Sequence, residues 1–243
     1  MRPVILKDAK DMGAKAAELV IGDIKKKPDL VLGLAVGGTM ISFYQSLVRL
    51  WKNKKCDFSH INTFNLDEYV GLSESDKRSF RYFMQRHFFS SVGVWQRNVH
   101  FLDGRAVNLN AECRNYEKKI KEVGGIDLQI LGIGRNGHIG FNEPGSGFKS
   151  RTRKILLSEI TLKDNARFFG NNVRKVPRRA LTMGIGTILE ARKIILLASG
   201  KKKAEIIHRA LHGEVSEDVP ASVLQKHKDV TFIFDKEASS ELD

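Results

Sequence analysis

The sequence predicts an α/β protein with an open, mostly parallel, Rossmann-like sheet flanked by helices. Five short apolar runs of the kind that buried parallel strands show alternate with amphipathic helical segments along the 243 residues. Glycine-rich loops follow several of these runs, where ligands sit beyond the carboxyl ends of strands. Residues 146–180 interrupt the alternation with a mixed composition, and we expect this segment to be a lid.

Composition favours one soluble globular domain spanning residues 1–243. Hydrophobic residues make up 42% of the chain and charged residues 28%, which is ordinary for such proteins. The longest apolar runs are far too short to cross a membrane. The amino-terminal residues are too highly charged for a signal peptide, and two cysteines provide no disulfide framework. We therefore expect a cytoplasmic protein.

The net charge of +13 comes from 41 Lys and Arg against 28 Asp and Glu. The basic residues are spread through the chain, and no aromatic residues interleave with them as in RNA-binding modules. A solvated basic surface explains this pattern, so we expect neither a nucleic acid nor a membrane as a partner.

The first strand-to-helix unit contains a candidate anion site. Residues 8–27 have the spacing of an amphipathic helix, residues 30–34 form a buried strand, and another helix begins after residue 39. Gly37, Gly38 and Thr39 lie between that strand and that helix, where free amides and a hydroxyl could bind a phosphate. The alternative is a tight turn in which Thr39 caps the helix.

The second strand, residues 61–66, ends at two adjacent carboxylates, Asp67 and Glu68. A carboxylate at the carboxyl end of a strand is a candidate general base. Neighbouring residues of an extended chain point to opposite faces, so only one of the two would reach a ligand. The alternative is a loop that carries two solvated acids.

The central stretch, residues 127–147, begins as the strand 128–131 and then becomes rich in glycine. Gly132, Gly134 and Gly137 match the dinucleotide pattern G-x-G-x-x-G, but His138 and the residues after it form a poor helix. In the other interpretation, the glycines let the backbone pass close to a small ligand that His138 and Glu143 reach.

The second half of the chain supplies further units of the sheet. Residues 181–190 resemble a turn that leads into a short helix, and residues 193–198 and 230–234 are apolar strands. A second junction with anion-binding character, residues 199–203, follows the first of these strands. His208 and His212 have the spacing of a zinc helix, but the required glutamate is missing, so we expect no metal site.

The motifs on these loops resemble those of the glucosamine-6-phosphate deaminase family. They appear in the family's order from about residue 30 to Gln225, and the ending Phe-Asn-Glu-Pro is specific. The matching stretches are Leu34–Thr39, Phe64–Gly71, Leu131–Pro144, Ser150–Arg153, Ala166–Phe169 and Ala180–Thr187. The sister family, 6-phosphogluconolactonase, shares the fold and is the alternative assignment; a sugar-phosphate sensor without catalysis is another.

The resemblance implies conversion of glucosamine 6-phosphate to fructose 6-phosphate and ammonia, without a metal or organic cofactor. Asp67 would take the proton from C2, while His138, supported by Glu143, would open the sugar ring. The presence of these three side chains argues against a non-catalytic sensor. The family's phosphate-binding positions correspond to Gly37, Gly38, Thr39, Arg167 and Lys203.

Three departures from the family pattern affect what the resemblance implies. Asn136 stands where many members have an Asp in the His–Glu relay, and Val36 and Met40 replace the usual Thr and Pro beside the glycine pair. Ile155 occupies the position of an allosteric Lys, so we expect no activation by N-acetylglucosamine 6-phosphate. The resemblance leaves open a monomer or a homo-oligomer, and glucosamine or galactosamine 6-phosphate as substrate.

Overall fold

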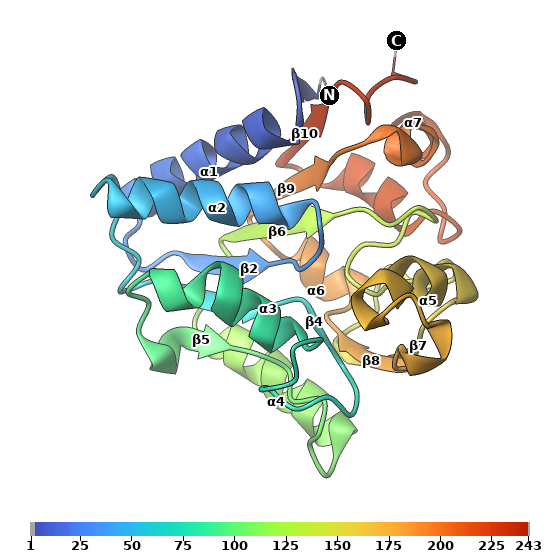
Figure 1. Ribbon diagram of the computed structural model, residues 1–243, viewed down its shortest axis with the longest axis horizontal. Coiled ribbons are helices and arrows are strands. Elements are labelled where there is room, and N and C mark those ends of the chain that lie inside the picture. Colours follow the sequence, from blue (N-terminus) through green and yellow to red (C-terminus); the bar gives the residue numbers. More distant parts are fainter. Residues whose placement is uncertain (1–2, 243) are drawn as a thin grey trace.

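The computed structural model describes residues 3–242; residues 1, 2 and 243 of the predicted domain lie outside the described residues. Its main element is a seven-stranded sheet with the order β1-β10-β9-β6-β2-β3-β5 (Figure 1). Every neighbouring pair in this sheet is parallel, which confirms the predicted fold class. The strands are β1 (Val4–Leu6), β2 (Val31–Leu34), β3 (Asn62–Asn65), β5 (Val99–His100), β6 (Leu128–Gly132), β9 (Lys193–Ala198) and β10 (Val230–Asp235).

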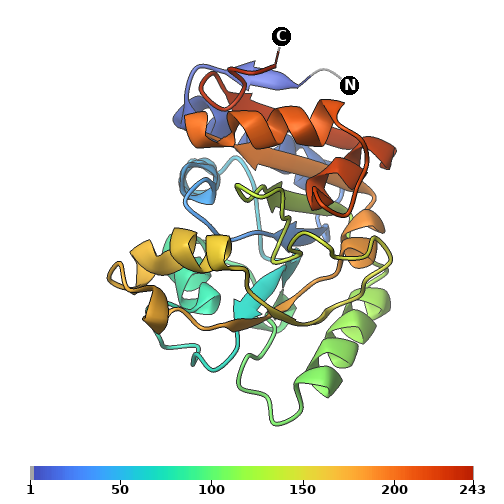
Figure 2. The same cartoon turned by 90° about the vertical axis from the view of Figure 1, so that its right-hand side faces the viewer.

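Helices cover both faces of this sheet. Helices α1 and α2 lie side by side on one face, and α4 and α6 lie on the other, as the edge-on view shows (Figures 1 and 2). The helices are α1 (Ala9–Lys26), α2 (Met40–Lys52), α3 (Phe80–His87), α4 (Leu109–Glu122), α5 (Glu159–Asn165), α6 (Ile185–Leu189) and α7 (Ala204–His212). Short 3₁₀ turns are η1 (Phe89–Ser91), η2 (Gln96–Asn98), η3 (Ala166–Phe169), η4 (Val173–Lys175), η5 (Lys201–Lys203) and η6 (Pro220–Lys226).

A second, antiparallel sheet has the order β4-β8-β7. Its strands are β4 (Asp67–Tyr69), β7 (Arg153–Leu156) and β8 (Arg179–Thr182). The chain passes from the first sheet to the second at Leu66, whose N–H bonds to Leu34 in β2 and whose carbonyl accepts from Met183 after β8. A separate hydrophobic cluster, which includes Tyr69, Phe141 and Phe169, packs against this small sheet.

The structure corrects the sequence prediction in several places. Strands β1 and β5 have only three and two residues, too few for a periodic pattern to reveal. The predicted turn at residue 181 is strand β8, which is recognisable only through its partners β4 and β7. Residues 146–180, for which the sequence predicted no individual helix or strand, contain β7, α5 and two 3₁₀ turns.

Strand order places the candidate site. From β2 the chain first adds β3 and β5 on one side, and then returns to add β6, β9 and β10 on the other. The loops after β2 and β6 therefore lead away in opposite directions and leave a crevice at the carboxyl ends of these strands. Both glycine-rich loops singled out in the sequence follow these two strands.

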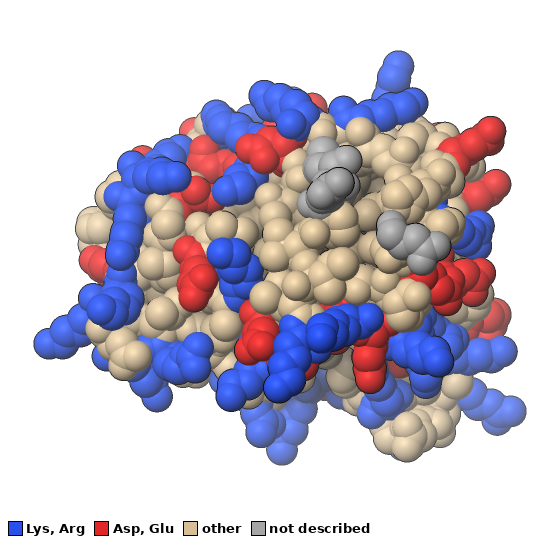
Figure 3. All heavy atoms as spheres, turned by 90° about the horizontal axis from the view of Figure 1, so that it is seen from above, with Lys and Arg blue, Asp and Glu red and all other residues tan. Residues whose placement is uncertain are grey.

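Charged side chains are dispersed on the face seen in Figure 3. Lys and Arg lie mainly around its edge with Asp and Glu among them, and its centre is largely uncharged. None of the described helices is both long enough and apolar enough to span a bilayer.

Candidate active site

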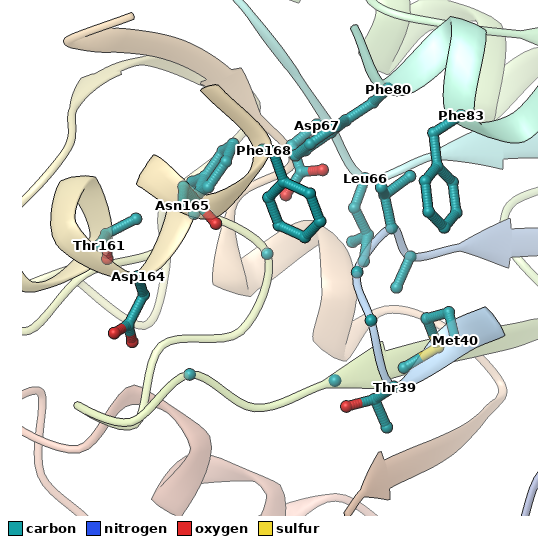
Figure 4. A pocket seen from close by; sticks show the side chains of 18 of the residues that line it. Thr39, Met40, Leu66, Asp67, Phe80, Phe83, Thr161, Asp164, Asn165 and Phe168 are labelled. Atoms are coloured by element: carbon teal, nitrogen blue, oxygen red, sulfur yellow. The ribbon is translucent and has the colours of Figure 1, made fainter. Parts of the chain in front are cut away.

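One cavity at the crevice between β2 and β6 brings together most of the predicted site residues (Figure 4). Seven of the nine line it: Gly37, Gly38, Thr39, Asp67, His138, Arg167 and Lys203. The remaining two, Asn136 and Glu143, are not among the lining residues and contact His138 instead. Residues that are distant in sequence are therefore assembled around a single small-molecule site.

Asp67 begins β4 and faces the cavity with only 6% of its surface exposed. Among the described residues, no group donates a hydrogen bond to its carboxylate, although Gly140 passes close to it. Burial, with a smaller contribution from the charge of Glu68, raises the pKa of Asp67 well above its usual value. A desolvated carboxylate without internal partners is a stronger base than a solvated one.

Glu68 points to the opposite face of β4, as the extended backbone requires. Its carboxylate accepts hydrogen bonds from the backbone N–H groups of Tyr69, Phe80 and Arg81, at 2.8, 3.0 and 2.9 Å. Phe80 and Arg81 are the first residues of α3, so Glu68 anchors this helix to β4. The alternative of two solvated acids in a loop is wrong, because both side chains are buried in a strand.

Asn136 connects His138 to Glu143. Its side-chain Nδ2 donates to Glu143 Oε2 at 2.7 Å, and its Oδ1 lies 2.7 Å from His138 Nδ1. A carboxylate can only accept, so the amide must present its oxygen to the imidazole. His138 Nδ1 then carries the proton, which leaves Nε2 as an acceptor.

Close packing explains the glycine at position 134. A Cβ atom there would lie 2.1 Å from the His138 ring, so the loop admits the imidazole only because Gly134 has no side chain. Burial lowers the pKa of His138, with Lys203 acting in the same direction and Glu143 in the opposite one. No helix begins at Gly137, and Ile139 and Asn142 instead form a β-bridge, so the dinucleotide interpretation is wrong.

The loop after β2 presents three backbone amides to the cavity. Among the described residues, no group accepts a hydrogen bond from the N–H of Gly37, Gly38 or Thr39. Gly37 has a φ of 146°, a conformation that favours glycine. The hydroxyl of Thr39 makes no capping hydrogen bond, so the alternative of a side-chain helix cap is wrong.

Two cations lie at the same end of the cavity. A guanidinium nitrogen of Arg167, in η3, lies 3.6 Å from the position that a Cβ on Gly38 would occupy. Lys203 donates from Nζ to the carbonyl oxygen of Ile133 at 2.7 Å. Burial lowers the pKa of Lys203 to about 8, and the charges of Arg135 and Arg167 contribute while Asp164 opposes.

Sequence reasoning missed several lining residues from two segments, although one of these residues, Phe168, lies within the matching stretch Ala166–Phe169. Residues 77–80 before and in α3 supply Arg78, and residues 161–168 supply Thr161, Asp164 and Phe168. Arg78 lies over the ring of Phe169, 5.4 Å from its centroid, so the two segments meet. No local pattern could identify these side chains, because only tertiary contacts bring them to the cavity.

Comparisons with known proteins agree with this geometry. Residues 7–233 match a family model described as glucosamine-6-phosphate isomerases/6-phosphogluconolactonase. A glucosamine-6-phosphate deaminase of Thermoanaerobacter sp. is 50% identical over 240 residues, 99% of this chain and 94% of that protein. One of Clostridium botulinum is 46% identical over 242 residues, 100% of this chain and 99% of that protein.

Two solved structures separate close from distant similarity. A structure described as a monomeric glucosamine-6-phosphate deaminase superposes with a TM-score of 0.97 at 46% identity, covering 99% of this chain and 100% of that one. A 6-phosphogluconolactonase from Trypanosoma cruzi gives 0.78 at 21% identity, covering 99% and 97%. The second similarity concerns the fold alone.

Proposed function

Because this chain belongs to the family of glucosamine-6-phosphate isomerases and 6-phosphogluconolactonases, we propose that it converts glucosamine 6-phosphate to fructose 6-phosphate and ammonia. The observation that carries this proposal is the buried Asp67 carboxylate, which lacks an internal hydrogen-bond partner and shares one cavity with His138. A reaction that removes a proton from carbon requires such a base.

The phosphate end of the substrate would lie in the loop after β2. The free amides of Gly37, Gly38 and Thr39 can donate to phosphate oxygens, and the start of α2 adds its favourable dipole. Arg167 offers a fork of donors and Lys203 a point charge to the same group. These contacts would hold the substrate without taking part in the chemistry.

His138 would open the pyranose ring. Its unprotonated Nε2 can accept the proton of the anomeric hydroxyl and return a proton to the ring oxygen, which leaves an open-chain aldehyde. Its lowered pKa keeps the ring neutral at neutral pH, the state in which Nε2 can accept. We assign Asn136 and Glu143 as positioning residues, because they contact the other ring nitrogen.

Asp67 would then move a proton between neighbouring carbons. The aldehyde makes the C2 proton acidic, and Asp67 takes this proton as O1 gains a proton from solvent, which gives an enolamine. Asp67 then delivers its proton to C1 while the nitrogen loses one proton to solvent, so that C1 becomes an alcohol and the amine becomes an imine at C2. Water adds to the imine carbon, and the nitrogen leaves as ammonia to give the ketone of fructose 6-phosphate. The raised pKa of Asp67 brings its basicity closer to what this step demands.

Residues 146–180 contribute Thr161, Asp164, Asn165, Arg167 and Phe168 to the cavity, and we propose that this segment is a lid.

One chain contains every residue that this mechanism uses, and the similar solved deaminase is described as monomeric, so we infer a monomer. Sedimentation equilibrium should give the mass of one 27.4 kDa chain; a larger assembly would contradict the inference. A cytoplasmic location stays a prediction.

Ammonia release from glucosamine 6-phosphate by the purified protein, without added metal, tests the function. We expect stoichiometric ammonia and fructose 6-phosphate, each measured by a coupled assay. The control substrate is 6-phosphogluconolactone, which should be hydrolysed no faster than in buffer. Rapid lactone hydrolysis without ammonia release would support the alternative lactonase assignment, and binding of the sugar phosphate without turnover would indicate a sensor.

A further inference from the structure

Asp164 is a lining residue to which the proposed mechanism gives no role. Of the described side chains that line the cavity, only Asp67 and Asp164 are carboxylates. Asp164 (Figure 4) comes from α5, which lies in residues 146–180, the covering segment. Its Oδ2 accepts from Arg135 Nε at 3.0 Å. A negative charge beside a phosphate site repels the ligand, so its presence there requires an explanation.

The spacing of side chains on α5 shows how Asp164 reaches the glycine-rich loop. Ser158, Thr161 and Asp164 follow one another at intervals of three residues, which places them on one side of the helix. Each contacts a different residue of the loop after β6. Ser158 donates to Glu143 at 3.1 Å, Thr161 lies 3.4 Å from His138 Nδ1, and Asp164 pairs with Arg135. Helix α5 is therefore held against the loop after β6 by three polar contacts.

Three positively charged side chains, Lys203, Arg135 and Arg167, lie near one another at the end of the cavity that is proposed to bind the phosphate. Lys203 is partly buried, and the charges of Arg135 and Arg167 both act against its protonation, as does burial itself. Of the neighbouring charged side chains that act on Lys203, Asp164 favours its protonated form, and the Ile133 carbonyl accepts a hydrogen bond from the ammonium at 2.7 Å. Asp164 also favours the protonated form of His138, whose pKa is raised by the charge of Glu143 and lowered by that of Lys203. A substrate dianion would need Lys203 as an ammonium when it arrives.

We propose that Asp164 is a positioning residue that supplies the counter-charge for the phosphate end of the cavity and so keeps Lys203 an ammonium. The proposal rests on the proposed function, because it assigns phosphate binding to Lys203. The covering segment then has a second use besides closing the site. It brings a carboxylate to a cluster of cations that would otherwise hold the ammonium less well.

Two substitutions in one ion pair separate this charge effect from a merely structural one. Both Asp164→Asn and Arg135→Gln break the pair between α5 and the loop after β6. Asp164→Asn removes the group that favours the Lys203 ammonium, so the alkaline limit of ligand binding should move to lower pH. Arg135→Gln removes a group that opposes it, so this limit should move to higher pH. A structural role predicts the same change in both variants.

The measurement is the affinity for fructose 6-phosphate by calorimetry, between about pH 7 and about pH 9, since this ligand has no amine that titrates there. Each affinity is expressed relative to the same variant's affinity at neutral pH. At the alkaline end we expect this relative affinity to be about two- to fivefold lower in Asp164→Asn than in wild type, and higher in Arg135→Gln than in wild type. Asp164→Glu should restore the wild-type profile. Thermal unfolding at each pH verifies that both variants are folded.

Shifts in the same direction, or profiles identical to wild type, would overturn the role of Asp164. Failure of the wild-type protein to bind fructose 6-phosphate at any pH would instead contradict the proposed function. Titrations of the substrate itself are common to all variants and cancel from the differences.

Discussion

Asp67→Asn is expected to reduce kcat for ammonia release by about 10²- to 10⁴-fold, the usual contribution of a positioned general base. Asparagine has the same shape but cannot accept the C2 proton. KM should change little, because the Asp67 carboxylate is proposed to act on the reacting carbon and not on the phosphate. In the wild type, activity should fall as the pH drops through the raised pKa of Asp67, since only the ionised carboxylate is a base. Steady-state rates of ammonia release across pH provide the measurement.

Glu68→Gln is the matched control, because it makes the same chemical change one residue along the same strand. In this variant the amide nitrogen of the glutamine would face backbone N–H groups that donate to the Glu68 carboxylate in the wild type. We therefore expect the free energy of unfolding to fall by about 1–3 kcal/mol, seen as a lower Tm. The kcat of the folded enzyme should remain within about threefold of wild type. If Glu68→Gln lost turnover while Asp67→Asn retained it, Glu68 would be the base and the proposed mechanism would be wrong.

His138→Asn is expected to lower kcat/KM by about 10²- to 10³-fold, because it removes the Nε2 acceptor that is proposed to open the ring. Asparagine is long enough to replace the Nδ1 donor, so the bond to Asn136 Oδ1, at 2.7 Å in the wild type, can be retained. The defect should therefore concern proton transfer more than the packing of the loop around Gly134.

The control for this variant is an open-chain ligand, the 6-phosphate of 2-amino-2-deoxyglucitol, which has no ring to open. Wild type and His138→Asn should bind it with affinities within about threefold, measured by calorimetry, because the proposed phosphate contacts do not involve Nε2. Equal loss of binding and turnover would mean that His138 serves mainly to hold the ligand. Unchanged turnover would remove His138 from the mechanism.

The sequence by itself predicted the fold class, and most of the residues that it predicted for the site line one cavity. Buried parallel strands are continuous apolar runs, and helices with one apolar face repeat every three to four residues, so both are readable locally. The glycine-rich loops were recognisable because close approach and unusual backbone angles restrict a position to glycine, as at Gly37 and Gly134. The choice of Asp67, His138 and Glu143 then depended on the resemblance, which the family match supports.

Only the tertiary structure decided which of two neighbouring carboxylates, Asp67 or Glu68, lines the cavity. The sequence could not tell Asp67 from Glu68, since alternation fixes that they diverge but not which one faces the ligand. Pairing of β4 with β8 directs Asp67 into the cavity, and β4 could not be recognised as a separate strand because its partner lies more than 100 residues away. The sequence could not show how an uncharged Asn136 would act where many family members have an Asp. In the structure, the Asn136 amide lies between His138 and Glu143 and contacts both.

The covering segment shows the same division most clearly. Residues 146–180 lack a consistent period because they alternate between a short strand, a short helix and 3₁₀ turns, each stabilised by packing on the small sheet. The role of their side chains can be inferred only from the tertiary contacts that they make. Asp164 is an unremarkable surface acid in the sequence, and it becomes a charge beside Arg135, Lys203 and His138 only when α5 is docked on the loop after β6.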